Sequence, residues 1–180
     1  MRVCGILLGV AAMFIGSTPA RAQIAMYAEA TGGTLKFQET PHIYGGTFGF
    51  YDTKRVGPVG IGADVRGGVL ERGSNKGPNT DTVLDMGQFG VRVAAAPGVL
   101  PVPLVPYVEV LTGLGYWRGG VSVTRQDANH LFTQVVAGAD LRVSRQIDWR
   151  VVEFSWGRLG AAPGANYPMM LSTGLVLRFR

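Results

Sequence analysis

The sequence predicts an all-β protein, an eight-stranded antiparallel up-and-down β-barrel that spans a membrane. Apolar and polar residues alternate along most of the chain, whereas no segment shows a convincing apolar repeat of 3.6 residues. Gly, Pro and Asn interrupt this alternation, and the links between alternating segments are short and long in turn. An even number of strands joined in this way can close into a barrel with short turns at one rim and long loops at the other.

The N-terminal residues 1–22 are expected to be a secretory signal peptide rather than part of the fold. Arg2 gives a basic start, residues 6–15 form a short apolar run, and Ala20-Arg21-Ala22 is a small-residue cleavage site. The run is too short to cross a bilayer as a helix. The barrel is therefore expected over residues 23–180, as one domain.

Eight strands are predicted from the alternation and from the breaking residues between segments. Because the links alternate in length, both ends of the mature chain are expected at the rim of the short turns. The predicted strands cover residues 24–31, 42–54, 59–70, 82–95, 104–118, 131–143, 147–158 and 168–179.

Sorting each strand by parity gives two faces of opposite polarity. In the third strand, for example, Ile61, Ala63 and Val65 alternate with Asp64 and Arg66. The polar face holds glycine and isolated charges of both signs, which suits the narrow interior of a small barrel better than a wet surface. We therefore expect the apolar face against lipid. The alternative is a soluble periplasmic lipocalin-like ligand-binding barrel, in which the two faces are reversed.

The candidate functional residues are the charged side chains expected inside this barrel. They either line a narrow ion-sensitive pathway or form an ion-pair network that plugs the interior, and the second is favoured because side chains can fill an eight-stranded barrel. Loss of Glu109 or Asp140 would then leave a buried arginine without its partner. The predicted set is Asp64, Arg66, Arg92, Glu109, Asp140, Arg142, Arg150 and Arg178.

Strict alternation fails in the predicted strand 147–158. It would turn Glu153 toward lipid, and Phe154 and Trp156 toward the interior. A carboxylate against hydrocarbon is unfavourable. A β-bulge near Val152 would return Glu153 to the interior and turn both aromatic side chains outward, so we predict a bulge there.

Composition gives little support to several classes of function. The one cysteine, Cys4, lies in the expected signal peptide, so the mature chain has no thiol for a disulfide, a nucleophile or a metal site. Without Arg2 and Arg21 the 17 basic residues become 15 against 12 acidic ones, a formal charge of +3. This excess is weak support for a nucleic-acid partner. No dinucleotide or P-loop motif is present, and no cofactor is expected.

Catalysis and metal binding are not expected either. Both histidines, His42 and His130, fall near the rim of the long loops, and Asp127, Ser122 and Ser155 could supply a carboxylate and a nucleophile. No spacing among them reproduces the motif of a lipid-acting enzyme, and loop histidines are usually solvated. Two histidines without cysteine do not make a closed zinc site. An outer-membrane lipid-modifying enzyme stays as the alternative.

The last predicted strand resembles the C-terminal signal that the assembly machinery of outer-membrane β-barrels recognises. Ser172, Gly174, Leu177 and Phe179 carry this resemblance, although Arg180 follows the final aromatic residue. The resemblance implies a location in the bacterial outer membrane and an interaction with the barrel assembly machinery during insertion.

With this layout, the mature chain resembles the small outer-membrane β-barrel family of OmpA-like, OmpX-like and opacity-protein domains. The resemblance implies a monomer in contact with outer-membrane lipids, with a structural, surface-interaction or narrow-pore role. Because the family also includes a few lipid-modifying enzymes, fold analogy does not choose among these roles. The segments that carry the resemblance are 62–68, 106–109 with Gly113 and Gly115, 138–141 and 172–179.

Overall fold

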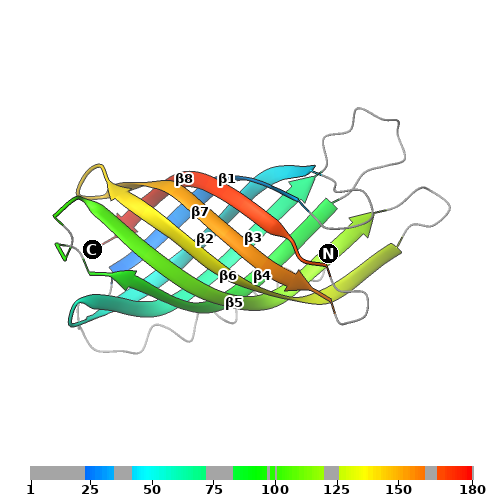
Figure 1. Ribbon diagram of the computed structural model, residues 1–180, viewed down its shortest axis with the longest axis horizontal. Coiled ribbons are helices and arrows are strands. Elements are labelled where there is room, and N and C mark those ends of the chain that lie inside the picture. Colours follow the sequence, from blue (N-terminus) through cyan, green and yellow to red (C-terminus); the bar gives the residue numbers. More distant parts are fainter. Residues whose placement is uncertain are drawn as a thin grey trace.

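The alternating segments form the strands of a closed antiparallel barrel. The computed structural model describes residues 23–34, 42–71, 83–96, 98–99, 101–119, 126–160 and 166–179, so the predicted signal peptide lies outside the described residues. The strands are β1 (Gln23–Thr34), β2 (His42–Val56), β3 (Val59–Glu71), β4 (Val83–Ala95), β5 (Leu104–Gly119), β6 (Gln126–Arg142), β7 (Ile147–Leu159) and β8 (Met169–Phe179). Each strand pairs with its neighbours along the chain, and β8 pairs with β1 to close the sheet (Figure 1).

The predicted eight-stranded antiparallel barrel is confirmed, and the predicted strand bounds differ mainly at the strand ends. The largest difference is in β6, which begins at Gln126 rather than at Leu131. β5 continues to Gly119, which pairs with Gln126, so the ladder extends into sequence that looks like a loop. Antiparallel pairing satisfies the backbone groups of this polar stretch and keeps it in the sheet. Within the described residues, no helix has the length and hydropathy needed to cross a membrane.

The first strand begins and the last strand ends at the rim of the short connections, as the alternating links predict (Figure 1). The connection between β2 and β3 is a two-residue hairpin, in which Gly57 has a φ of 62° and Pro58 follows. A positive φ at the first of two central residues is typical of a type II′ turn, whose twist matches that of the flanking strands. Glycine adopts this φ without strain.

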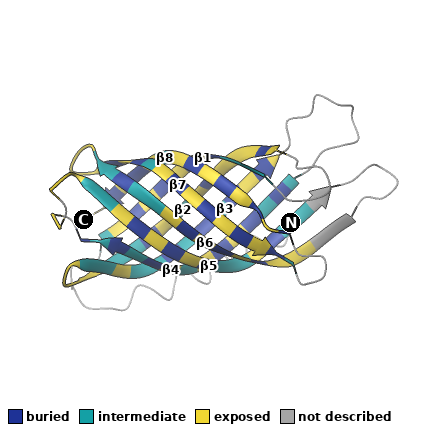
Figure 2. Cartoon of the chain, in the orientation of Figure 1, coloured by how far each residue is buried: buried dark blue, intermediate teal, exposed yellow. Residues whose placement is uncertain are grey.

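The outer face of the barrel is apolar, and the inner face is polar over much of its length. Buried and exposed residues alternate along the strands (Figure 2). Val91, Val135 and Leu177 are 55%, 50% and 47% exposed, whereas Arg92 and Asp140 are each 1% exposed. The polar side chains therefore face the barrel axis, and the arrangement with the two faces reversed is wrong for this chain.

The bulge predicted in β7 is confirmed. The register of β7 shifts between Ala139 and Asp140 on the β6 side, and between Arg150 and Glu153 on the β8 side. Beyond this point Glu153 faces the interior and is 1% exposed, while Phe154 faces outward and is 43% exposed. The extra residue lets one strand keep a carboxylate inside the barrel and an aromatic ring outside it.

Candidate functional site

Three buried arginines from separate strands meet inside the barrel. Arg66 lies on β3, Arg92 on β4 and Arg150 on β7, and none is more than 3% exposed. All three occupy positions of inward parity, so the alternation of their strands places them there. A buried guanidinium group is unfavourable unless carboxylates and hydrogen-bond acceptors surround it. The contacts of these three side chains therefore determine what the site can do.

Arg66 is held by two carboxylates and a phenol. Its Nη2 atom lies 3.1 Å from Oε2 of Glu109 and 3.0 Å from Oε2 of Glu153, and its Nη1 atom donates to the other oxygen of Glu153. Its Nε atom donates to the hydroxyl of Tyr27 at 2.9 Å, and that hydroxyl donates to Oδ1 of Asp64 at 2.9 Å. The bidentate contact with Glu153 fixes the plane of the guanidinium group.

Arg92 lies between two carboxylates and two aromatic rings. Its Nη1 atom contacts Glu109, and its Nη2 atom donates to Oδ2 of Asp140 at 2.8 Å. Its central carbon lies 3.6 Å from the ring centre of Tyr107 and 4.1 Å from that of Tyr51. Aromatic ring faces attract a guanidinium group, so both the edges and the faces of this cation have favourable contacts.

Arg150 contacts three carboxylates. Its Nε atom donates to Oδ1 of Asp140 at 2.9 Å, and its Nη1 atom lies 3.0 Å from Oε2 of Glu153 and also contacts Glu29. The hydroxyl of Tyr107 donates to Oε2 of Glu153 at 2.6 Å. The bulge in β7 is what brings Arg150 and Glu153 onto the same inner face.

These contacts close into a ring of alternating charge, here called the charge ring. Each of its carboxylates bridges two arginines, and each of its arginines bridges two carboxylates. Such an arrangement compensates charges that are out of contact with water, and it holds the surrounding strands in one arrangement. The order around the ring is Arg66, Glu109, Arg92, Asp140, Arg150 and Glu153, which contacts Arg66 again.

Three of the charged residues predicted for the interior, Asp64, Arg142 and Arg178, lie outside the charge ring. Asp64 is joined to the ring only through the hydroxyl of Tyr27. Arg178 lies nearer the short-connection rim, with its Nη2 atom 2.8 Å from Oδ1 of Asp148. Arg142 lines a cavity of about 280 Å³ on that side of the ring. The structure thus places five of the predicted residues in the charge ring, links Asp64 to it through Tyr27, and leaves Arg142 and Arg178 nearer the rim.

Sequence reasoning missed Glu29 and Tyr27 on β1 and Tyr107 on β5. Their parity was informative, because Tyr27 and Glu29 lie two residues apart and alternate with Met26, which is exposed on the outer face. A tyrosine is an ambiguous signal, however, since tyrosines also gather on the outer face at lipid interfaces. Only their contacts identify these three side chains as part of the interior site.

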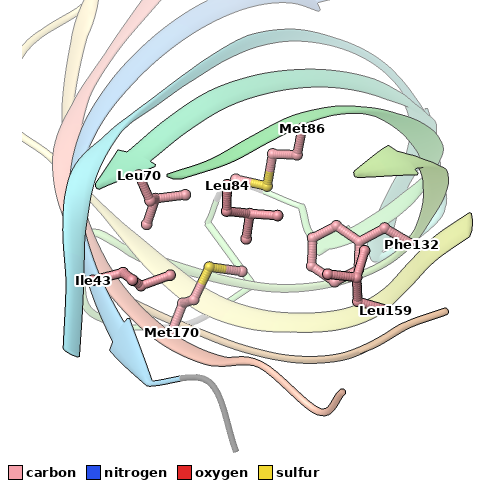
Figure 3. Close-up of a cluster of buried hydrophobic side chains, with 7 residues drawn as sticks. All are labelled: Ile43, Leu70, Leu84, Met86, Phe132, Leu159 and Met170. Atoms are coloured by element: carbon pink, nitrogen blue, oxygen red, sulfur yellow. The ribbon is translucent and has the colours of Figure 1, made fainter. Parts of the chain in front are cut away.

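The interior becomes apolar toward the long-loop rim. Side chains from six strands form a buried cluster there, here called the apolar plug (Figure 3). Gln88 and Gln134 lie between the plug and the charge ring, and Nε2 of Gln134 donates to Oε1 of Gln88 at 2.7 Å. The sequence predicted glycine and charges for the interior, so this apolar level is a difference from that prediction. The members of the plug are Ile43, Leu70, Leu84, Met86, Phe132, Leu159 and Met170.

The residues considered for catalysis are not brought together. His42 begins β2 and His130 lies on β6, on opposite sides of the eight-stranded barrel, and both are exposed. Ser155 faces the interior and is buried. Ser122 lies outside the described residues, and the side chain of Asp127 is outside the described part as well. Among the described residues, no group of three His, Cys, Asp or Glu side chains could hold a metal ion.

The residues predicted to form the targeting signal lie on β8 with the expected alternation. Leu177 and Phe179 are exposed on the outer face, and Ser172 is buried inside. Gly174 lies where β8 meets β1, and a Cβ atom there would come within 2.1 Å of the carbonyl oxygen of Ala28. The strand therefore closes the barrel, and its role as an assembly signal stays a prediction.

The architecture is shared with solved structures of low sequence identity. No protein-family model and no curated protein matches the sequence. Neisserial surface protein A matches with a TM-score of 0.62 and 15% identity, over 87% of this chain and 97% of that chain. The attachment invasion locus protein Ail of Yersinia pestis matches with a TM-score of 0.55 and 10% identity, over 88% of this chain and 97% of that chain.

A further match is the N-terminal β-barrel domain of Pseudomonas aeruginosa OprF, with a TM-score of 0.50 and 15% identity, over 88% of this chain and 100% of that chain. At these identities the likeness concerns the fold and not the activity. The matches agree with the closed eight-stranded sheet. This chain therefore has the fold of the small eight-stranded bacterial outer-membrane β-barrels.

Proposed function

We propose that this protein is an integral, monomeric protein of the bacterial outer membrane that acts through its outer wall and rims rather than as an open pore. The membrane location is supported by the outer face, where residues such as Phe89 and Leu131 are 61% and 63% exposed. A continuous apolar surface of this kind is unfavourable in water and favourable in lipid. Residues 1–22 would direct export, and β8 would be recognised by the barrel assembly machinery.

The observation that carries the proposal of a closed barrel is the charge ring. A solute that crossed the interior would have to separate charges that each have two partners, and then pass the apolar plug. Both steps are unfavourable, because neither level offers a hydrated path. A structural or surface-interaction role therefore has more support than a narrow pore. A monomer is supported because the sheet closes within one chain and leaves no strand edge open.

A lipid-modifying enzyme in the same scaffold has less support. The two histidines lie on opposite sides of the barrel, so they could not act on one substrate. The buried Ser155 lies on the inner face of the sheet, out of reach of an outer-leaflet lipid. We therefore propose a non-catalytic role.

The membrane location is tested by fractionation and by a heat-mobility gel. The full chain is expected to fractionate with outer membranes, and the folded protein in detergent is expected to migrate differently before and after boiling. Such a shift is characteristic of closed barrels that resist the detergent until heated. Release of the protein by alkaline carbonate without detergent would contradict the proposal.

The closed interior is tested by conductance in planar lipid bilayers. The wild-type protein, inserted and shown by the heat-mobility gel to be folded, is expected to give no stable ionic conductance above that of the bare bilayer, because the charge ring and the plug both block the path. Reproducible ohmic conductance steps from the wild-type protein would show a pore instead.

A further inference from the structure

A groove lies on the outer face of the barrel near the long-loop rim, where β6 and β7 approach the residues that precede β8. Its volume is about 810 Å³. Trp156 and Arg158 line it from β7, His130 and Thr133 are among the residues that line it from β6, and Tyr167 lines it from the residues before β8. These side chains lie on the outer face, so in the proposed orientation the groove faces the outer leaflet of the membrane.

Backbone pairing and one aromatic stack build the walls of the groove. Thr133 pairs with Arg158 between β6 and β7, and Asn166 pairs with the end of β7 on the other side. The rings of Trp156 and Tyr167 lie 6.4 Å apart with an angle of 17° between their planes. Because the sheet fixes these positions, the groove is held by the rigid part of the molecule.

Arg158 is a cation in this groove without a protein partner in the described part of the chain. Its side chain is exposed, and no described residue forms an ion pair or hydrogen bond with it. By contrast, Arg66, Arg92 and Arg150 each contact at least two carboxylates. A guanidinium group on a lipid-facing wall needs an anion or water, because hydrocarbon solvates it poorly.

The surroundings of Arg158 indicate which anion is available. The stacked rings of Trp156 and Tyr167 are typical of the depth where headgroups meet acyl chains. Lipid phosphates lie at that depth, and a guanidinium group binds phosphate through two parallel N–H donors. The groove of about 810 Å³ is large for a phosphate ion alone, which favours a headgroup that brings its carbon skeleton with it.

We propose that this groove binds the phosphate-bearing headgroup of an anionic lipid in the outer leaflet. Arg158 binds the phosphate, and the stacked rings pack against the carbon skeleton of the headgroup. Thr133 lines the same groove, and its hydroxyl lies 3.2 Å from that of Thr112. The inference rests on the proposed membrane location and adds a specific lipid site to it.

The test uses Trp156 as a reporter inside the groove. The chain has three tryptophans, and the substitutions Trp117→Phe and Trp149→Phe leave Trp156 alone. This parent protein is placed in phosphatidylcholine bilayers that contain either brominated phosphatidylglycerol or brominated phosphatidylcholine. Quenching of the fluorescence of Trp156 is expected to give a binding constant about fivefold higher for the anionic lipid, the size of effect of a partly screened charge-assisted contact.

Two arginine variants of the same parent separate a specific site from general charge. Arg158→Gln is expected to bring the ratio of the two binding constants to about one, because the phosphate then loses its charged partner. Arg145→Gln removes the same charge from an exposed position in the β6–β7 connection at the opposite rim, and it is expected to keep the preference. Equal quenching by both lipids in the parent would overturn the inference. An equal loss of the preference for the anionic lipid in both variants would also overturn it.

A further arm distinguishes a lipid from a free anion. Inorganic phosphate is added to the parent in bilayers that contain brominated phosphatidylglycerol, with sodium chloride at the same ionic strength for comparison. The same small loss of quenching in both salts is expected for a lipid site. A larger loss with phosphate would identify a free-anion site and overturn the lipid assignment. Absence of a heat-mobility shift in the wild-type protein would contradict the membrane location itself, and the gel shows this before any quenching is measured.

Discussion

At the scale of single residues, the charges inside the barrel are stable because each member of the charge ring has partners on two sides. Glu153 illustrates this best, because it accepts hydrogen bonds from Arg66, Arg150 and Tyr107. Its removal would affect two arginines that have no access to water. The number of partners of a residue, rather than its charge alone, therefore determines how much a substitution costs.

The substitution Glu153→Gln is expected to lower the free energy of unfolding by about 3 kcal/mol, because Arg66 and Arg150 each lose one anionic partner. Urea-induced unfolding of the protein in lipid vesicles measures this change. The matched control is Glu71→Gln, at the exposed end of β3, which is expected to change the same free energy by less than about 0.5 kcal/mol. A similar loss in both variants would show that the charge ring adds no specific stability.

At the scale of the strand, close contact between neighbouring backbones determines where the sheet can accept a side chain. Gly174 on β8 would place a Cβ atom 2.1 Å from the backbone oxygen of Ala28 on β1, whereas a Cβ atom on Gly87 of β4 would meet nothing within 4 Å. The first position lies at the seam that closes the barrel, and the second lies on the open outer face. These two glycines thus have different roles in the same sheet.

The substitution Gly174→Ala is expected to destabilise the barrel by about 2 kcal/mol or more, because the β1 and β8 backbones must move apart to admit the methyl group. Two measurements report this destabilisation. The heat-mobility shift is expected to be lost at a lower temperature, and the urea midpoint of unfolding in vesicles is expected to fall. Gly87→Ala is the control, and it is expected to be neutral or stabilising by about 0.5 kcal/mol, since alanine has less backbone entropy to lose. Equal stability of the two variants would contradict the role of the close contact.

At the scale of the whole molecule, the interior is blocked at two levels in series. The charge ring closes it by paired charges, and the apolar plug closes it by side-chain packing nearer the long-loop rim. The two levels share strands β3, β4, β6 and β7 but are built from different residues of these strands. Because a solute must pass both, opening either level alone leaves the other as a barrier.

Conductance measurements on combined variants test this arrangement. Leu84→Ala with Phe132→Ala shrinks the plug, and Arg92→Ala with Glu109→Ala removes two adjacent members of the ring while Arg66 keeps Glu153. Each pair of substitutions by itself is expected to leave the barrel closed, and the four together are expected to give measurable conductance in planar bilayers. Conductance from either pair alone would show that the remaining level is not sufficient to close the interior.

Much of the fold could be predicted because a strand displays its two faces within its own sequence. Alternation in β3 assigned Asp64 and Arg66 to the interior, and the break in alternation at Glu153 predicted the bulge. Each of these inferences needs only the period of two residues in a strand and the cost of a charge against lipid. The extension of β6 to Gln126 could not be predicted, because it depends on pairing with β5 rather than on the residues themselves.

The sequence by itself determined the strand number, the inward and outward faces and the identity of most interior charges, since all of these follow from local periodicity. Only the tertiary structure decided which charges meet. Glu109, for example, bridges Arg66 and Arg92, and this depends on the relative register of three strands after closure. It also decided that Leu84 and Phe132, distant in sequence, pack together as part of a plug. Register and closure are properties of the complete sheet, so no single strand contains them.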